Sequence, residues 1–364
     1  MTNAPPLRRG WTTGACAAAA TRAAVEALWT GHFPDPVGIV LPGGQTPAFA
    51  LAMQHLAPGQ ASAGIVKDAG DDPDVTHGAL VIATVSHGVP GSGVLFRAGP
   101  GVGTVTRPGL PLPPGEPAIN PAPRAMIRAA VAEVAGLFGG SCDIIVEISI
   151  PGGEKIAERT LNGRLGIVGG LSILGTTGIV VPYSCAAWIH SIHRGIDVAR
   201  AAGIVHVAGA TGATSEAAVK KLHGLPDIAL LDMGDFVGGM LKYLRIHPVR
   251  SITIAGGMGK ITKLGQGFLD LHSRRGEVDL GWLAARSFEA GGDNALARQI
   301  AAANSAKHAF ELAAAAGVEL AACVATAAWQ SAAKVLRGGD FALEIVIFDR
   351  DGLLLAKTPF QPAH

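Results

Sequence analysis

The chain has 364 residues, of which 49% are hydrophobic and 16% charged, and its formal net charge is +1. This length exceeds what one hydrophobic core usually supports, so we expect two domains, and the apolar content excludes an intrinsically disordered chain. The balanced charge, with no basic block, argues against a nucleic-acid-binding protein. The four cysteines stand far apart and show none of the paired spacings of zinc or redox sites.

Residues near the amino terminus bear on where the protein resides. Arg8 and Arg9, followed by alanines, resemble a twin-arginine export signal, but Arg22 and Glu26 interrupt the apolar stretch that such a signal needs. The longest uncharged run, residues 165–192, contains glycines and a proline, which suit strands and loops rather than a membrane span. We therefore expect a cytoplasmic protein with no membrane association.

Residues 1–202 are predicted to form an α+β domain with a mixed sheet. Thr12 or Thr13 caps a helix that continues to about Trp29. The Gly- and Pro-rich stretch 99–123 is too irregular for regular elements and long for a connection, so we expect it to be functional. The other predicted elements are strands at 37–41, 64–66, 79–86 and 143–150 and helices at 122–138 and 182–202.

Residues 203–364 are predicted to form an α/β domain with a mainly parallel sheet. Strands of the buried type alternate with helices at similar intervals, which favours parallel strands joined by crossovers. Asp351 and Gly352 predict a tight turn between the last two strands. The predicted strands lie at 204–208, 228–231, 251–255, 341–348 and 353–356, and the predicted helices at 215–222, 236–245, 294–315 and 318–336.

A loop rich in small residues joins the first strand of this second domain to a helix. Its backbone amides can surround an anionic or nucleotide group at the start of the helix. Asp232 ends the next strand about twenty residues later, where α/β nucleotide sites usually hydrogen-bond a ribose hydroxyl. Because tight packing alone also produces glycine-rich turns, the loop predicts either a nucleotide site or a close packing contact. Its candidate binding residues are Gly209, Thr211, Gly212, Ser215 and Glu216.

A second cluster concentrates charged side chains on one loop between strands. Its members are Lys67, Asp68, Asp71, Asp72, Asp74 and His77. The aspartates are oxygen donors of the kind that Mg²⁺ or Ca²⁺ prefers, but the loop lacks the EF-hand spacing, so we predict no metal site. His77 or one of the carboxylates is a candidate general base, and a solvated turn is the alternative. His190 and His193 lack a third ligand, so we assign no metal there either.

The tripeptide Thr-Thr-Gly occurs twice, and three arginines lie among Gly- and Pro-rich stretches. Thr12, Thr13, Thr176 and Thr177 can hold a carboxylate with their hydroxyls and amides, or they can cap a helix and close a turn. Arginines in such stretches suit bidentate capture of acidic substrate groups, although solvated surface arginines are the commoner case. The three are Arg107, Arg124 and Arg164.

Taken in order, several long segments resemble the CbiD family. The resemblance rests on GWTTGACAAAA at 10–20, VKDAGDDPDVTHG at 66–78, GVGTVTRPGLPLPPGEPAINPAPRAMI at 101–127 and LNGRLGIVGGLSILGTTGIV at 161–180. Shorter similarities extend it across nearly the whole chain, namely GATGATSE at 209–216, DMGDFVG at 232–238 and GGMGKITKL at 256–264. One departure is Ala213, at a position where the family often carries a basic or bulkier residue.

The resemblance implies an enzyme of oxygen-independent cobalamin synthesis that methylates C1 of cobalt-precorrin-5B. S-adenosylmethionine would supply the methyl group, and cobalt would enter only as part of the substrate. The resemblance also implies an α+β first domain and an α/β second domain. We hypothesise that the donor binds the second domain at the glycine-rich loop and at Asp232, Gly256 and Gly257. The first domain would bind the corrinoid through Lys67 and through the threonines and arginines named above. Carbon methylation also requires loss of a proton, for which His77 and the loop aspartates are candidates.

Two other functions fit parts of the sequence. A dinucleotide-dependent oxidoreductase would use the same strand, loop and acidic residue. A non-catalytic tetrapyrrole carrier would use the arginines and glycines, but it would leave the nucleotide-type loop unexplained. A homo-oligomer, and hand-over of the corrinoid from neighbouring pathway enzymes, are compatible with the sequence.

Overall fold

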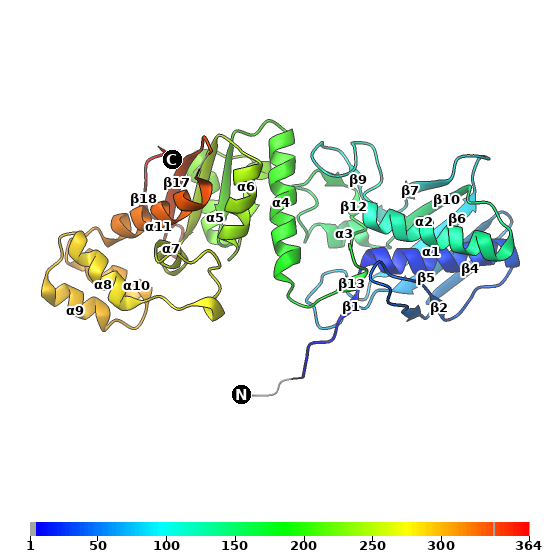
Figure 1. The fold of residues 1–364 in the computed structure, drawn as a ribbon, viewed down its shortest axis with the longest axis horizontal. Coiled ribbons are helices and arrows are strands. Elements are labelled where there is room, and N and C mark those ends of the chain that lie inside the picture. Colours follow the sequence, from blue (N-terminus) through cyan, green and yellow to red (C-terminus); the bar gives the residue numbers. More distant parts are fainter. Residues whose placement is uncertain (1–4, 338, 364) are drawn as a thin grey trace. The chain divides into compact units, whose positions relative to one another are not determined.

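The computed structural model describes residues 5–337 and 339–363, and the chain divides into two compact units, Met1–Ser184 and Cys185–His364 (Figure 1). Helices and sheets occur in both units, as expected for a chain of mixed α and β structure. The predicted division at residue 202 falls later, at the end of helix α4 (Cys185–Ala201). This helix belongs to the second unit because it packs against α6 (Val237–Ile246) and β15 (Leu230–Asp232).

A five-stranded mixed sheet forms the base of the first unit. Its neighbouring strands are antiparallel, except for the last pair, which is parallel. The central strands alternate buried and partly exposed residues, because successive side chains point to opposite faces of a sheet. In spatial order the strands are β4 (Met53–Ala57), β5 (Gln60–Val66), β6 (Leu80–His87), β10 (Ile144–Ser149) and β7 (Val94–Ala98). Strands β4 and β7 were not predicted, because they lie at the two edges of the sheet and bury few of their residues.

Two long helices of this unit confirm the sequence prediction. Helix α1 (Thr13–Thr30) packs against α2 (Pro121–Phe138) and against β5 and β6 (Figure 1). Most of α1 is buried, and its alanines allow close approach to the sheet. A Cβ atom at Gly14 would lie 2.7 Å from the ring of Pro123, so glycine is required where the two helices meet.

The Gly- and Pro-rich stretch of the first unit contains short paired strands rather than a wholly irregular loop. These strands tie residues 101–105 to residues 167–171, and another pair ties the start of the chain to residues 179–180. The pairs are β8 (Gly101–Val102) with β12 (Gly170–Leu171), β9 (Thr104–Val105) with β11 (Ile167–Val168), and β1 (Gly10–Trp11) with β13 (Ile179–Val180). The remaining elements of the unit are β2 (Val37–Gly38), β3 (Ala48–Phe49) and α3 (Gly153–Ala157).

The second unit contains a sheet in the order β15-β14-β16-β17-β18, whose first four strands are parallel. The last strand is antiparallel, and β19 (Gln361–Pro362) also pairs with β17. Both faces of the sheet are buried: α5 (Ala213–His223) covers one, and the other helices supply the larger core on the opposite face. The strands not yet defined are β14 (His206–Ala210), β16 (Ser251–Gly257), β17 (Ala342–Phe348) and β18 (Leu354–Lys357).

The helices that follow β16 differ in part from the prediction. The single helix expected at 294–315 is two helices, α9 (Asn294–Ala301) and α10 (Ala306–Ala315). Ser305 begins the second, because its hydroxyl accepts a hydrogen bond from the backbone N–H of His308 at 3.2 Å. Helices α7 (Met258–Gly265) and α8 (Leu280–Glu289) were not predicted, and α11 (Leu320–Leu336) was.

Throughout the described ranges, no helix combines the length and apolar character needed to span a lipid bilayer.

Candidate functional site

The first Thr-Thr-Gly motif lies at the start of α1 and contacts the segment that carries the second Thr-Thr-Gly motif. The Thr12 hydroxyl accepts from the Ala15 backbone N–H at 3.1 Å, which caps the helix. The Thr13 hydroxyl donates to the main-chain oxygen of Leu174 and accepts from its N–H, at 3.2 and 3.0 Å. Both threonines are buried, so the structure favours the capping alternative over a direct ligand contact. Thr176 and Thr177, in contrast, are exposed.

The acidic loop is held from inside by a lysine. Lys67 is 1% exposed, and its ammonium group donates to Asp74 at 2.5 Å. Asp74 also accepts from the backbone N–H and the hydroxyl of Thr76, at 2.8 and 2.6 Å. Burial raises the pKa of Asp74, but the Lys67 charge and the Thr76 hydrogen bonds lower it by more, so the net shift is downward. This geometry favours a structural role for Lys67 over the predicted substrate contact.

Asp68 and His77 lie together at the exposed side of the same loop. Asp68 forms an ion pair with Arg8 and accepts from the Gly70 backbone N–H, and these hydrogen bonds lower the pKa of Asp68 to about 2. The Nδ1 atom of His77 accepts from the Ala69 backbone N–H at 3.0 Å. The lone pair of the neutral imidazole is therefore engaged, and the proton of the ring lies on Nε2.

The other two aspartates hold neighbouring backbone with one oxygen each. Asp71 accepts from the backbone N–H of Arg8 at 2.6 Å, and Asp72 accepts from that of Tyr183 at 2.8 Å. Asp71 is exposed and Asp72 half-buried. Within the described part of the chain, the second oxygen of each accepts no hydrogen bond, so these two carboxylates retain acceptor capacity.

The three predicted substrate arginines differ in what they contact. Arg124 donates to two main-chain oxygens, at 2.8 and 3.1 Å, and pairs with Glu116 at 2.8 Å, so its guanidinium is committed inside the unit. Pairing of β9 with β11 brings Arg107 beside Arg164, whose main-chain oxygen lies 3.5 Å from the Arg107 guanidinium. Arg107 is exposed and Arg164 half-buried. The structure thus brings the Arg107 side chain to the backbone of Arg164.

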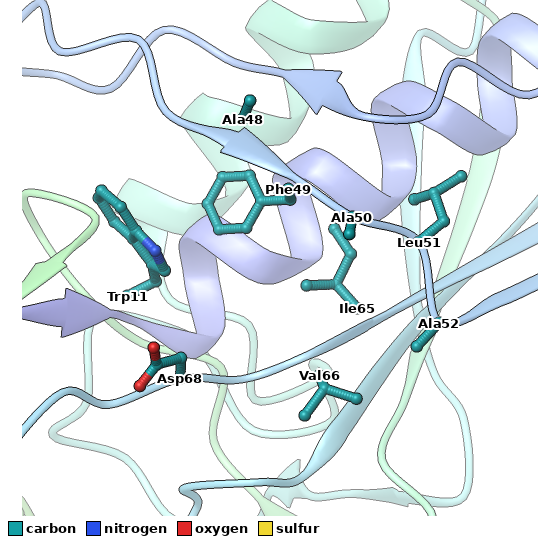
Figure 2. Close-up of a pocket in the computed structure, with 9 residues that line it drawn as sticks. All are labelled: Trp11, Ala48, Phe49, Ala50, Leu51, Ala52, Ile65, Val66 and Asp68. Atoms are coloured by element: carbon teal, nitrogen blue, oxygen red, sulfur yellow. The ribbon is translucent and has the colours of Figure 1, made fainter.

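A pocket of about 320 Å³ lies where the first motif meets the acidic loop (Figure 2). Trp11 and Asp68 stand at one end of it, and Leu51 and Ala52 at the other. The Trp11 and Phe49 rings meet edge to face, with centroids 5.5 Å apart. The sequence did not predict this aromatic pair, because Trp11 and Phe49 lie on separate short strands that only the fold brings together.

In the second unit the predicted nucleotide-binding residues gather at the carboxyl edge of the parallel sheet. Ala210, at the end of β14, pairs with Asp232 on one side and with Ala255 on the other. The chain runs from β14 to β15, which lies on one side of β14, and then crosses over to β16, which lies on the other side. A topological switch point therefore lies between β14 and β16. Open α/β sheets bind their ligands in the crevice at such a point.

The glycines at this edge serve two purposes. A Cβ atom at Gly209 would lie 2.4 Å from the sulfur of Met240, and one at Gly256 would lie 2.9 Å from the Thr211 side chain, so these glycines allow close packing. A Cβ atom at Gly212 or Gly257 would meet nothing within 4 Å. These two residues precede α5 and α7, and they leave open space at two helix N-termini.

Ser215 and Glu216 lie in the first turn of α5. The Ser215 hydroxyl donates to the main-chain oxygen of Gly212 at 2.9 Å, which fixes the loop at the start of the helix. Within residues 5–337 and 339–363, no group of three or more His, Cys, Asp or Glu side chains has an arrangement that could hold a metal ion.

Comparison with known proteins gives the same family along the whole chain. The model of the family CbiD matches residues 1–182, and that of the CbiD C-terminal domain matches residues 270–359. A Bradyrhizobium protein named cobalt-precorrin-5B C(1)-methyltransferase is 63% identical over 97% of this chain and 94% of its own length. A protein of the same name from Agrobacterium fabrum is 61% identical over 100% of this chain and 96% of its own length.

One solved structure is also similar, a cobalamin biosynthesis protein (cbiD) from Archaeoglobus fulgidus. It is 26% identical, covers 86% of this chain and 85% of its own, and superposes with a TM-score of 0.39. The family models and the close relatives, taken with the motifs at both ends of the chain, establish that this protein belongs to the CbiD family.

Proposed function

We propose that the protein transfers a methyl group from S-adenosylmethionine to C1 of cobalt-precorrin-5B in cobalamin biosynthesis. The observation that carries this proposal is the 63% identity, over nearly the full length of both chains, to a relative bearing that enzyme name. The relative's name favours a methyltransferase activity for this protein over the two alternatives, a dinucleotide-dependent oxidoreductase and a non-catalytic tetrapyrrole carrier. Mass spectrometry tests it: the purified protein should add 14 daltons to cobalt-precorrin-5B, and an unchanged substrate mass would contradict the proposal.

The methyl donor is proposed to bind at the carboxyl edge of the second unit's sheet. Open space at Gly212 and Gly257 fits a ligand group approaching the N-termini of α5 and α7, and Asp232 ends the adjacent strand. S-adenosylmethionine bound there supplies the electrophilic methyl group. The protein's contribution is to hold the donor and exclude water, since methyl transfer needs little covalent help.

Calorimetry with S-adenosylhomocysteine tests this location. Asp232→Ala removes the carboxylate and should weaken binding about tenfold or more, in line with loss of a charged hydrogen bond. Gly212→Val fills the open space and should weaken binding at least as much, because its side chain occupies the position of the ligand. Unchanged affinity in both variants would move the donor site elsewhere.

The corrinoid is proposed to bind the first unit. The Arg107 guanidinium lies near the main-chain oxygen of Arg164, so the two residues are neighbours, and both are proposed to contact the substrate's carboxylates. Arg124 instead pairs with Glu116 and donates to main-chain oxygens of its own unit. The exposed Thr176 and Thr177 remain candidates for the same role. The apolar pocket beside Trp11 fits an uncharged part of the macrocycle (Figure 2).

Asp71 or Asp72 is proposed to accept the proton that leaves the macrocycle. Asp68 is a weak base because its pKa is about 2, Asp74 is paired with Lys67, and the His77 lone pair is engaged. The two remaining carboxylates each keep an available oxygen. Single-turnover rates should therefore fall in Asp71→Asn or Asp72→Asn and change little in His77→Ala. A rate loss confined to His77→Ala would contradict this assignment.

A further inference from the structure

Trp188 of the second unit is anchored at one atom and exposed elsewhere. It lies in the first turn of α4, and its side chain is 46% exposed. The indole Nε1–H donates to the main-chain oxygen of Asp232 at 3.0 Å. The polar atom of the ring is thus satisfied within the protein, while much of its apolar surface faces solvent. A large exposed aromatic ring fixed in this way is typical of ligand-binding surfaces.

The backbone after β15 also holds the ring. The indole lies 3.4 Å from the position that a Cβ atom would take at Gly234, whose φ of +54° places it in the left-handed region. The Phe236 ring lies beyond, with its centroid 6.4 Å from that of Trp188 and a 50° angle between planes. Trp188 is therefore positioned by the end of the strand that carries Asp232, rather than projecting freely from its helix.

The direction of the anchoring bond shows on which side of β15 the ring lies. The N–H of Met233 donates to the main-chain oxygen of Ala210, so it points toward β14. In a trans peptide the preceding C=O, that of Asp232, points the opposite way. Trp188 thus extends the carboxyl edge of the sheet outward, and the order along this edge is Gly257, Gly212, Asp232 and Trp188.

We infer that Trp188 provides the stacking surface for the adenine base of the methyl donor. This inference rests on the proposed donor site. If the donor's ribose binds Asp232 and its amino-acid end lies at the switch point between β14 and β16, its adenine base extends from Asp232 in the opposite direction. That direction leads outward, past the edge strand β15. The indole is the aromatic surface that stands there, and stacking on an aromatic ring contributes strongly to the binding of a base.

Calorimetric titration of the full chain with S-adenosylhomocysteine tests the inference. Trp188→Ala should weaken binding about tenfold, the effect expected for loss of one stacked base, and Trp188→Phe should stay within about threefold of the wild type. Phe288→Ala is a matched control, because Phe288 is 49% exposed on α8 of the same unit and should leave the affinity unchanged. Indole fluorescence supplies a second readout: the ligand should quench the wild type, and the quench should disappear in Trp188→Phe.

The outcomes separate this inference from the donor site on which it rests. If Trp188→Ala binds within twofold of the wild type, or if Trp188→Phe is still quenched, Trp188 does not contact the base. If that result accompanies weak binding by Gly212→Val and Asp232→Ala, the donor site stands and only the role of Trp188 is overturned. If Gly212→Val and Asp232→Ala bind normally, the donor site itself is wrong.

Discussion

At the scale of single residues, Thr12 shows how one hydroxyl can begin a helix and join two distant motifs. Its side chain caps α1, and its backbone N–H donates to the main-chain oxygen of Gly178 at 3.0 Å. Thr12→Ala should lower the free energy of unfolding by about 1 kcal/mol through loss of the cap, and Thr12→Ser should retain most of it. Urea unfolding measures both, and equal stability of the alanine variant and the wild type would contradict the capping role.

A second residue-scale prediction concerns His206, which lies in a polar network beneath α5. Its Nε2 lies 2.8 Å from the hydroxyl of Thr253, which donates to the buried Glu344. Burial, with a contribution from the nearby His223, lowers the pKa of His206 from 6.5 to about 4. The folded protein therefore binds fewer protons than the unfolded chain between these two values, so stability should fall as the pH drops through this window.

The matched variant for this effect is His206→Gln, which keeps an N–H donor for Thr253 but does not titrate. Allowing for partial exposure, the wild type should lose about 2 kcal/mol more than the variant between neutral pH and about pH 4. Urea unfolding across this range measures the difference. Parallel stability curves would show that the neutral form of His206 is not favoured by folding.

At the scale of elements, the loop between β14 and α5 contains glycines with different functions. Gly209 faces the sulfur of Met240 on α6, whereas the Cβ position at Gly212 is open. Gly209→Ala should cost about 1–3 kcal/mol through overpacking, while Gly212→Ala should leave stability nearly unchanged because its backbone is extended. Thermal unfolding of the two variants compares them, and similar melting temperatures would contradict this distinction.

The same scale shows which elements sequence patterns can predict. Helix α1 was predicted to within about one residue, because its cap and its alanines are local signals. The edge strands β4 and β7 were missed, because what defines them is pairing with β5 and β10 rather than a buried periodicity of their own. The break between α9 and α10 was missed as well, since a serine cap within an alanine-rich run gives a weak signal.

At the scale of the whole molecule, each unit has its own core. The hydrophobic clusters of the second unit draw only on residues after Cys185, and its sheet is complete within that unit. Residues 185–364 expressed alone should therefore unfold in one cooperative transition, and S-adenosylhomocysteine should raise its melting temperature. Calorimetry of the fragment measures both; a broad, non-cooperative transition would show that this unit depends on the first.

The sequence by itself determined the family, the principal helices and buried strands, and the segments in which candidate site residues lie, because these depend on local patterns and long motifs. The tertiary structure decided which of those side chains are available. Lys67 and Arg124 looked like anion-binding residues, yet the fold commits one to Asp74 and the other to Glu116 and backbone oxygens. It also placed Trp188 against Asp232, 44 residues apart, because hydrogen bonds and burial depend on contacts that no local pattern records.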